Sequence, residues 1–600
     1  MISAMTRYSF ILLNGDQEGF IARLQELGLV DIVRSEKPVD TNSRAMAARA
    51  ERCHALIQAL QGLRFPEDIR PQDPEGPLAD AVENGLQRLQ ELDAALAEVQ
   101  KEAQACAPWG DFSEARFRAL AEAGVPLHFH ILPAKAFQET WADEYALAKI
   151  AVQDSQVYFV VAGTDDGLPG EVPAPARSSA DAQAEEQALT AQRNGILSRL
   201  QGAAGRIPEL EAEAQGALGE LDRYLAGDAG QKTAEEKLVT YIGYAPSESD
   251  AMLSEALDRM GVCYFAEAAK AEDNPPIKLK NNWFSRQFEV LTTMYGSPVY
   301  DEFDPTPILG PFFLLFFALC MGDAGYGLLL LLLGPMLKKW MPSMAKFAPL
   351  VTMLGGTTLL VGLFLHTFFG INLQEAGWVP QEMKRFMLTQ ERVAGYDAQM
   401  VLAIGVGVFH ICLATVVKAL CYTRRYGFAN TLGTWGWTLL IVGGVVLAGL
   451  TLAGAIGQDI VRIAVIALGT LSAVGIFLLN DIHRNPLLNI GAGFWATYNT
   501  ATGLLGDVLS YLRLFALGMA GGMLGHTFNM LAGMVLHLQV PVLNILCFVL
   551  ILLIGHSLNL ALSCLGAFVH PLRLTFVEYF KNSGYEGTGR AYRPLQINNK

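Results

Sequence analysis

Residues 505–534 read LGDVLSYLRLFALGMAGGMLGHTFNMLAGM, an apolar stretch long enough to cross a bilayer, with an arginine inside it. An arginine keeps its charge in a protein. At the centre of a membrane helix it costs at least about 2.5 to 3.5 kcal/mol, so it faces protein, water or a partner charge. We therefore interpret Arg513 as a functional residue.

Charge and hydropathy divide the chain into two halves. The 600 residues are 52% hydrophobic and 17% charged, with a mean hydropathy of +0.28, too apolar for one soluble domain of this length. Residues 301–600 hold 17 Lys+Arg and 13 Asp+Glu, which leaves 27 and 46 for residues 1–300. An acidic, water-soluble half therefore precedes a membrane half, and neither is basic enough to indicate nucleic acid as a partner.

The first half is expected in the cytoplasm. The N-terminal run has too short an apolar core for a signal peptide and no small-residue cleavage site. Its three cysteines, Cys53, Cys106 and Cys263, lack metal or redox spacing. His128 and His130 alternate on an expected strand without metal-ligating partners, and residues 227–233 lack the adjacency of a phosphate loop. We predict no cofactor and no metal site.

Two long Ala/Leu/Glu-rich segments dominate the soluble half. They cover about 41–107, interrupted by four prolines, and about 178–226. A compact lobe at about 110–165 separates them, so they can pair antiparallel as a coiled-coil arm with this distal lobe at its tip. A plain helical bundle remains the alternative. Short strands at 8–13 and 29–33 around a helix at 17–27 predict a proximal αβ lobe, assigned to residues 1–40 and 230–300.

Eight apolar spans follow in the second half. We place them at about 307–321, 324–337, 349–373, 399–420, 432–455, 460–480, 505–534 and 540–577. Every second connection is basic: these charges are Lys338, Lys339, Lys346, Lys418, Arg424, Arg425, His483, Arg484, Lys581, Arg590, Arg593 and Lys600. The positive-inside rule then predicts eight crossings with both termini in the cytoplasm. The first two spans are short and could instead form a re-entrant pair.

A polar stripe runs along the last span. Its members fall within an arc of about 100° at helical spacing; they are His556, Asn559, Ser563, His570 and Arg573. Such a stripe is either polar glue between helices or the wall of a water-filled path, and the residues alone do not decide between the two. Arg573 can snorkel towards the cytoplasmic end.

Arg513 has no counter-ion on its own helix. It shares a face with Ser510, while Asp507, six residues earlier, lies about 240° round the helix. The arginine is therefore placed to meet a carboxylate from another helix or another subunit. Asp323, between the first two spans, is interpreted as a turn residue, and His366 and His410 are interpreted as satisfied packing residues.

The chain resembles the membrane-embedded stator subunit of vacuolar-type and archaeal-type rotary ATPases, called subunit a or subunit I, in its prokaryotic form. The resemblance covers essentially the full length. Two motifs carry it most specifically, Gly506-Asp507-Val508-Leu509-Ser510-Tyr511-Leu512-Arg513-Leu514-Phe515-Ala516-Leu517 and Gly566-Ala567-Phe568-Val569-His570-Pro571-Leu572-Arg573-Leu574 through Val577-Glu578. Gly322-Asp323-Ala324-Gly325-Tyr326-Gly327 and the run from Asn274 to Thr306 support it.

This resemblance implies a non-catalytic subunit through which protons or sodium ions pass. Two half-channels would lead to a rotor ring whose subunits each carry a membrane carboxylate, with Arg513 facing that carboxylate. Arg573 matches the second arginine of the family, and His570, Ser563, Asn559 and His556 would line the interface or a half-channel. The soluble arm would brace peripheral stalks, and the ATPase head would be an indirect partner.

Two positions depart from the eukaryotic pattern. Ser563 stands where those members have a glutamate, and Gly521 stands where they have a histidine. The resemblance implies an ion-translocation set of Arg513, Arg573, His570, Ser563, Asn559, His556, Ser510 and Asp507, and the two departures leave its division between the half-channels open. The alternatives are a self-contained secondary ion transporter, disfavoured because no internal repeat is visible, and a membrane scaffold whose arginines only pack.

The predicted fold class is mainly α. Residues 1–300 form the cytoplasmic arm with two small α/β lobes, residues 301–580 an eight-helix transmembrane domain with long, tilted last two helices, and residues 581–600 a cytoplasmic tail. The expected location is the bacterial or archaeal cytoplasmic membrane.

Overall fold

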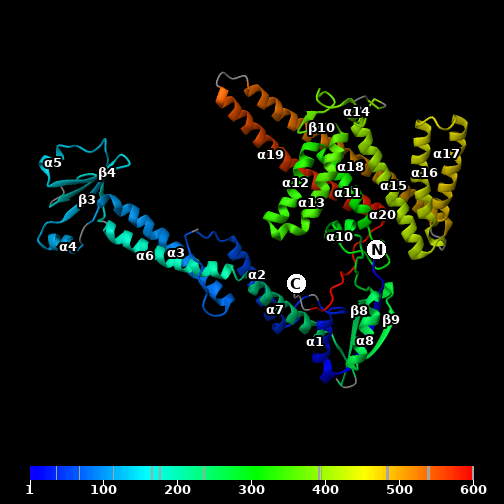
Figure 1. Ribbon diagram of the computed structural model, residues 1–600, viewed down its shortest axis with the longest axis horizontal. Coiled ribbons are helices and arrows are strands. Elements are labelled where there is room, and N and C mark those ends of the chain that lie inside the picture. The colour runs from blue at the N-terminus through cyan, green and yellow to red at the C-terminus, as the bar shows by residue number, and fades with distance from the viewer. Residues whose placement is uncertain are drawn as a thin grey trace. The chain divides into compact units, whose positions relative to one another are not determined.

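The computed structural model describes the chain except for residues 36, 67, 112–113, 164–166, 175–177, 234–236, 389–391, 394, 481–484, 537–540 and 597–600. The basic residues His483, Arg484 and Lys600 therefore lie outside the described part. The chain divides into two compact units, one of residues 1–10 and 242–594 and one of residues 11–241 and 595–600. Figure 1 labels many of the elements of both.

The second unit contains two packed pairs of helices and a small sheet. Its elements are α1 (Gln17–Leu27), β2 (Asp31–Ile32), α2 (Thr41–Gly62), α3 (Leu78–Cys106), α4 (Glu114–Glu122), β3 (Leu127–Pro133), α5 (Trp141–Glu144), β4 (Leu147–Gln153), β5 (Gln156–Ala162), β6 (Glu171–Val172), α6 (Ser179–Ala204), α7 (Ile207–Asp228) and β7 (Gln231–Thr233). Helix α2 packs along α7 and α3 packs along α6. Both expected long segments are thus helical and paired, but each is broken, the first at 63–77 and the second at 205–206.

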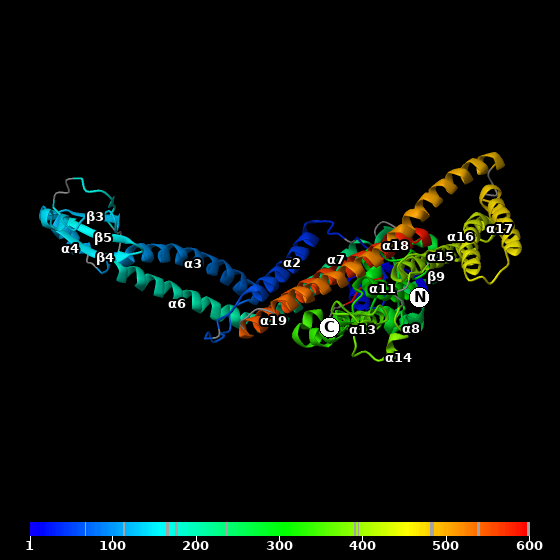
Figure 2. The ribbon, with the colours of Figure 1, turned by 90° about the horizontal axis from the view of Figure 1, so that it is seen from above.

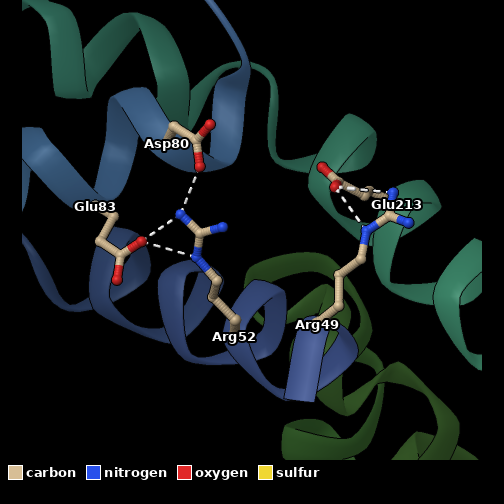
Figure 3. A network of polar contacts seen from close by, with 5 residues as sticks. All are labelled: Arg49, Arg52, Asp80, Glu83 and Glu213. Atoms are coloured by element: carbon tan, nitrogen blue, oxygen red, sulfur yellow. Dashed lines mark hydrogen bonds and ion pairs between the residues drawn. The ribbon is translucent and has the colours of Figure 1, made fainter. Parts of the chain in front are cut away.

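A side-chain cap fixes the start of α2, and ion pairs connect α2 to α3. The Asp40 side chain accepts the Ser43 backbone N–H and caps α2. Hydrogen bonds from Ser43 and Tyr224 lower the pKa of Asp40 to about 2. Later in α2, Arg52 Nη2 donates to Asp80 of α3 (2.6 Å) and the Arg52 guanidinium pairs with Glu83 of α3, as Figure 3 shows.

The distal sheet lies at the end of the α3–α6 pair (Figure 1). Its strand order is β4-β5-β3-β6, with antiparallel pairing in which His130 lies opposite Phe159. Buried Val157, Phe159 and Val161 form its core. Strand β6 extends this lobe to residue 172, beyond the expected end at 165, because two residues after the turn at Gly170 pair with β3.

Near the N-terminus, a second sheet has the order β2-β8-β1-β9, with β7 paired to β8. Strands β1 (Met5–Leu13) and β8 (Leu238–Pro246) are each divided between the two units, and β9 covers Cys263–Ala268. In the first unit, Tyr8 on β1 donates to Asp250 at the start of α8 (Asp250–Met260) at 2.8 Å. The expected proximal strands and helix are therefore present.

The rest of the first unit is almost entirely helical. Its helices are α9 (Trp283–Arg286), α10 (Glu289–Tyr295), α11 (Thr306–Met321), α12 (Ala324–Trp340), α13 (Ala348–Phe364), α14 (Gln381–Lys384), α15 (Ala398–Tyr426), α16 (Leu432–Leu452), α17 (Gln458–Ala473), α18 (Pro486–Val535), α19 (Pro541–Arg573) and α20 (Phe580–Ser583). A short hairpin pairs β10 (Thr367–Phe368) with β11 (Ile371–Asn372). Six of the described helices are long and apolar enough to cross a membrane, and α11 is a shorter apolar helix.

Several span boundaries differ from the expected ones, and three of them bear on the site. The third span ends at Phe364, and its expected last residues form the β10–β11 hairpin instead. The seventh begins at Pro486, so that α18 has 50 residues. The eighth ends its α-helix at Arg573 and continues as a π-helical turn, Leu574–Tyr579, into α20. Figure 2 shows α18 and α19, the two longest helices of this unit.

Candidate functional site

Arg513 lies within α18 with its side chain half-buried. Its Nη1 atom is buried and has no hydrogen-bond partner among the described residues. Cys320 of α11 lies close enough for the arginine charge to act on it. A buried guanidinium N–H without an acceptor is costly, about 1 to 3 kcal/mol or more for a charged group, so this nitrogen needs an acceptor that the described residues do not supply.

Close contacts fix the register between α18 and α19. A Cβ at Gly521 would lie 3.1 Å from Ser563 Oγ, and a Cβ at Gly525 would lie 3.3 Å from Asn559 Nδ2. Residue numbers therefore rise along one helix as they fall along the other, which is an antiparallel pair. Eight residues before Gly521 is Arg513, and eight after Ser563 is Pro571, so the arginine lies level with the segment that carries His570 and Arg573.

The first three residues of the polar stripe, His556, Asn559 and Ser563, are hydrogen-bonded to one another or to neighbouring helices, and we call them the outer part of the stripe. Asn559 Nδ2 donates to Tyr326 Oη (2.8 Å) and to the Gly521 carbonyl (2.9 Å). Tyr326 Oη lies 2.7 Å from His556 Nδ1, and His556 Nε2 lies 3.0 Å from Asn529 Oδ1. Ser563 Oγ donates to Asn559 Oδ1 at 3.2 Å.

One arrangement of protons satisfies every atom of this outer network. The Asn559 amide can only donate to Tyr326, so the Tyr326 hydroxyl donates to Nδ1 of His556. Asn529 Nδ2 donates to the Phe369 carbonyl at 2.6 Å, which leaves Asn529 Oδ1 as the acceptor for His556 Nε2–H. His556 is therefore assigned as a neutral imidazole with its proton on Nε2.

Asp323 is more than a turn residue. Its fully buried carboxylate caps α12 by accepting the N–H groups of Gly325 (2.8 Å) and Tyr326 (3.2 Å). It also accepts the N–H groups of Phe369 (2.8 Å) and Gly370 (2.7 Å) at the β10–β11 turn. The carboxylate thus joins the α11–α12 connection to the loop after α13, next to the outer network.

The last two residues of the stripe, His570 and Arg573, form its inner part and lack the hydrogen bonds of the outer part among the described residues. His570 is half-buried, Arg573 is exposed, and within the described ranges neither has a hydrogen bond or an ion pair. The positive charges of Arg513 and Arg573 both act on His570. Three basic side chains thus gather here without a carboxylate between them, in a part of the unit built from apolar helices.

Asp507 and Ser510 do not join this basic group. Asp507 is 8% exposed; its Oδ2 accepts from Asn582 Nδ2 at 2.7 Å and its Oδ1 lies 3.5 Å from Lys581 Nζ. The inference that Asp507 is not the counter-ion of Arg513 is therefore confirmed. Ser510 Oγ donates to the Gly506 carbonyl of its own helix at 3.1 Å.

A cavity of about 310 Å³ adjoins Asp507. Residues of α15, α16, α18 and α20 line it, and its polar members include Thr415, Lys418, Asn499, Asp507, Lys581 and Asn582. It therefore combines two cationic groups and one carboxylate with neutral hydrogen-bonding side chains. Such a lining can hold water.

The two single histidines have different surroundings. His410 is 1% exposed, has its Nδ1 2.9 Å from Tyr511 Oη, and stacks on Tyr579 at 4.6 Å. Its interpretation as a satisfied packing residue is confirmed. His366 adopts a φ of +55°, and its buried Nδ1 lacks a hydrogen-bond partner among the described residues. The prediction that the hydrogen-bonding atoms of His366 are satisfied was therefore wrong.

Tyr326 and Asn529 are the site residues that the sequence did not single out. Tyr326 stands in the run Gly325-Tyr326-Gly327, and Asn529 is an isolated amide in an apolar helix. The amide of Asn529 was a usable signal, because polar residues on buried faces of membrane helices usually find partners. In the described ranges no group of three or more His, Cys, Asp or Glu could hold a metal ion.

Comparison with known proteins gives consistent relatives. The model of the V-type ATPase 116 kDa subunit family matches residues 228–364. The A-type ATP synthase subunit I of Methanocaldococcus jannaschii is 28% identical over 82% of this chain and 71% of its own length. The V-type ATP synthase subunit I 1 of Treponema pallidum is 27% identical over 99% of this chain and all of its own length.

A solved structure is also similar in part. It is a crystal structure of the cytoplasmic N-terminal domain of subunit I, homolog of subunit a, of V-ATPase. The similarity covers 44% of this chain and 100% of that one, with 17% identity and a TM-score of 0.19.

Proposed function

This chain belongs to the V-type ATPase 116 kDa subunit family, and from that premise we propose that it is the ion-translocating stator subunit of a V/A-type rotary ATPase. It is a multi-pass membrane subunit of the ATPase rather than a catalytic one. Protons or sodium ions would pass between this chain and a ring of rotor subunits, each with a carboxylate in the membrane.

The observation that carries the proposal is the unpartnered, buried Nη1 of Arg513. A rotor carboxylate that comes opposite α18 would supply the acceptor that this nitrogen lacks. The fixed positive charge favours the ionised form of that acid, so the rotor site releases its ion on arriving at Arg513. The same charge repels a cation that approaches from either side, which keeps the two access routes separate.

His570 and Arg573 would extend this positive interface along α19. Their lack of partners within the described residues leaves their polar atoms available to a moving surface. His556, Asn559 and Ser563 would hold α19 beside the outer half-channel. The cavity at Asp507 would provide water-filled access on the other side, where the basic connections put the cytoplasm.

The remaining parts of the proposal concern topology and partners. Eight crossings with both termini in the cytoplasm would place the cavity at the inner side of a bacterial or archaeal cytoplasmic membrane. The paired helices α2–α7 and α3–α6 would form a coiled-coil arm that braces peripheral stalk subunits against the torque of the rotor. The paired packing of these helices supports this role.

The test is the substitution Arg513→Ala in the assembled complex, reconstituted in vesicles. We expect ATP-driven ion uptake to fall at least tenfold while the subunits still co-purify in normal ratio. Arg462→Ala, an exposed arginine on α17, is the matched control and should pump normally. Normal pumping by Arg513→Ala would show that the arginine only packs, and ion transport by the isolated subunit would favour a secondary transporter.

A further inference from the structure

A second buried group without a hydrogen-bond partner among the described residues is the carboxyl of Glu578, which lies near Tyr511 of α18. Glu578 is 1% exposed and belongs to the π-helical turn Leu574–Tyr579 that follows α19. Its Oε2 atom is buried and has no hydrogen-bond partner among the described residues, and none of the ion pairs found there includes it. π-Helical turns inside helices occur frequently at functional sites. The fold thus buries a carboxyl group without the partners that a structural carboxylate normally has.

The neighbours of Glu578 are themselves titratable and buried. Its charge acts on Tyr511 of α18, which is fully buried. Tyr511 Oη lies 2.9 Å from His410 Nδ1, and the ring of His410 stacks on Tyr579. The hydroxyl of Tyr579 is also buried without a partner in the described part of the chain. We call His410, Tyr511, Glu578 and Tyr579 the buried quartet.

The buried quartet adjoins the cavity at Asp507. Asn582, which lines the cavity, donates through Nδ2 both to Asp507 Oδ2 and to the Glu578 carbonyl, each at 2.7 Å. The charge of Asp507 acts on the same Tyr511 hydroxyl as that of Glu578. Asn582 therefore contacts both the carboxylate in the cavity wall and the backbone of the residue that carries the unpartnered carboxyl.

A purely structural role does not account for this arrangement. A buried polar atom left unpaired costs about 1 to 3 kcal/mol, and the quartet contains two such atoms, on adjacent residues. A leucine or methionine at position 578 would fill the same space without that cost. A carboxyl that exchanges a proton with cavity water needs a free oxygen, and this explains what packing does not.

We propose that Glu578 takes up and releases the transported proton between the water of the Asp507 cavity and the interior of the membrane unit. In one direction, a hydronium ion in the cavity transfers its proton to a carboxylate oxygen of Glu578 and leaves a water molecule, and the Glu578 carboxyl then passes that proton to the ionised carboxylate of a rotor subunit. In the other direction, the rotor carboxyl protonates Glu578, and Glu578 protonates a water molecule of the cavity. This inference rests on the proposed function and specifies protons as the coupling ion.

Several ionisable groups face this site and will shape its response to pH. Helix α15 contributes His410 and Lys418, α18 contributes Tyr511 and Asp507, and Tyr579 and Lys581 come from the segment of Glu578 itself. Of these, Lys581 pairs with Asp507, and the remaining groups offer Glu578 no direct ion pair in the described ranges.

The test compares Glu578→Gln with Arg513→Ala in the reconstituted complex, with quenching of a pH-sensitive dye as the measure of ATP-driven proton uptake. Gln keeps the size of the side chain but cannot exchange a proton at neutral pH. We expect uptake to fall at least tenfold, with assembly unchanged. Glu586→Gln, a half-exposed glutamate eight residues further on, is the matched control and should pump within twofold of the wild type.

Each outcome separates the two proposals. Loss of pumping in Arg513→Ala with normal pumping in Glu578→Gln would overturn the role of Glu578 alone, and normal pumping in both would overturn the stator mechanism as well. A wild-type complex that moves sodium and no protons would also overturn the role of Glu578. If Glu578→Gln does not assemble, Glu578→Asp decides: its pH profile for pumping should shift by at least half a pH unit, and an unchanged profile contradicts the proposal.

Discussion

The outer and inner parts of the α18–α19 pair use similar residues in opposite ways. In the outer part, His556, Asn559 and Ser563 are joined to Tyr326, Asn529 and Gly521 by a closed set of hydrogen bonds. In the inner part, Arg513, His570 and Arg573 face no such partners in the described residues. The outer part of the stripe on α19 therefore stabilises the packing of α19 against its neighbours. The inner part is a candidate interface for another subunit.

This difference makes stability and transport separable. Substitutions in the outer part remove hydrogen bonds that already exist, so they should lower the free energy of unfolding. Substitutions in the inner part remove side chains that have no hydrogen bonds among the described residues. If the proposed function is right, they should change pumping while the subunit stays equally stable.

Asp323→Asn should have the largest effect on stability. The carboxylate accepts four backbone N–H groups, whereas an amide has one oxygen and turns an NH₂ group towards some of those donors. We expect a loss of about 3 kcal/mol, from charge-assisted hydrogen bonds and the N–H groups left unpaired. Thermal unfolding of the detergent-solubilised subunit measures it. Asp459→Asn, an exposed aspartate in the first turn of α17, is the control and should leave the unfolding temperature unchanged.

Asn559→Leu should come next, with a loss of about 2 kcal/mol. The substitution keeps the volume but leaves the Gly521 carbonyl and the Ser563 hydroxyl without their partner, and buried groups left unpaired carry most of the cost. The same unfolding measurement applies, with the exposed Asn430→Leu for comparison. A variant as stable as the wild type would mean that water replaces the amide and that the outer part is not the fixed structure described above.

His570→Ala should have the smallest effect on stability, within about 0.5 kcal/mol, because no hydrogen bond is lost within the described part of the chain. Pumping by the assembled complex should nevertheless change, since the side chain lies in the electrostatic field of Arg513 and Arg573. A destabilisation as large as that of Asn559→Leu would reveal a partner for His570 and remove the contrast between the two parts.

The sequence predicted the positions of the helices better than the residues at which they begin and end. Each of the eight expected spans overlaps a helix, and six of the described helices are long and apolar enough to cross a membrane. Hydropathy located these helices because apolar length is a local property of the chain. The end of the third span was wrong because the turn at Phe369 and Gly370 is held by Asp323, 46 and 47 residues earlier. The start of α18 was missed because its first turns mix Asn, Thr and Gly with aromatic residues, which weakens a hydropathy signal.

The site was predictable to a similar degree. Helix geometry excluded Asp507 as the counter-ion of Arg513 and placed five polar residues on one face of the last span. Geometry along one helix could not tell which of the five were already bonded, because their partners Tyr326 and Asn529 lie 230 and 27 residues from His556. Nor could it reveal Glu578 as unpartnered, since burial and the missing partner both depend on the packing of three segments.

The hydrogen-bonded network of the outer part also cannot pass protons along its side chains. Its direction of donation runs from the Asn559 amide through Tyr326 to His556, and from His556 through Asn529 to a backbone carbonyl. This relay begins at the carboxamide of Asn559 and passes through the carboxamide of Asn529. Carboxamides neither give up nor accept a proton at physiological pH, so a proton cannot be passed along these side chains in either direction. Under the proposed function, ions that cross this level of the membrane would therefore have to pass through water beside these side chains and not along the hydrogen-bonded network.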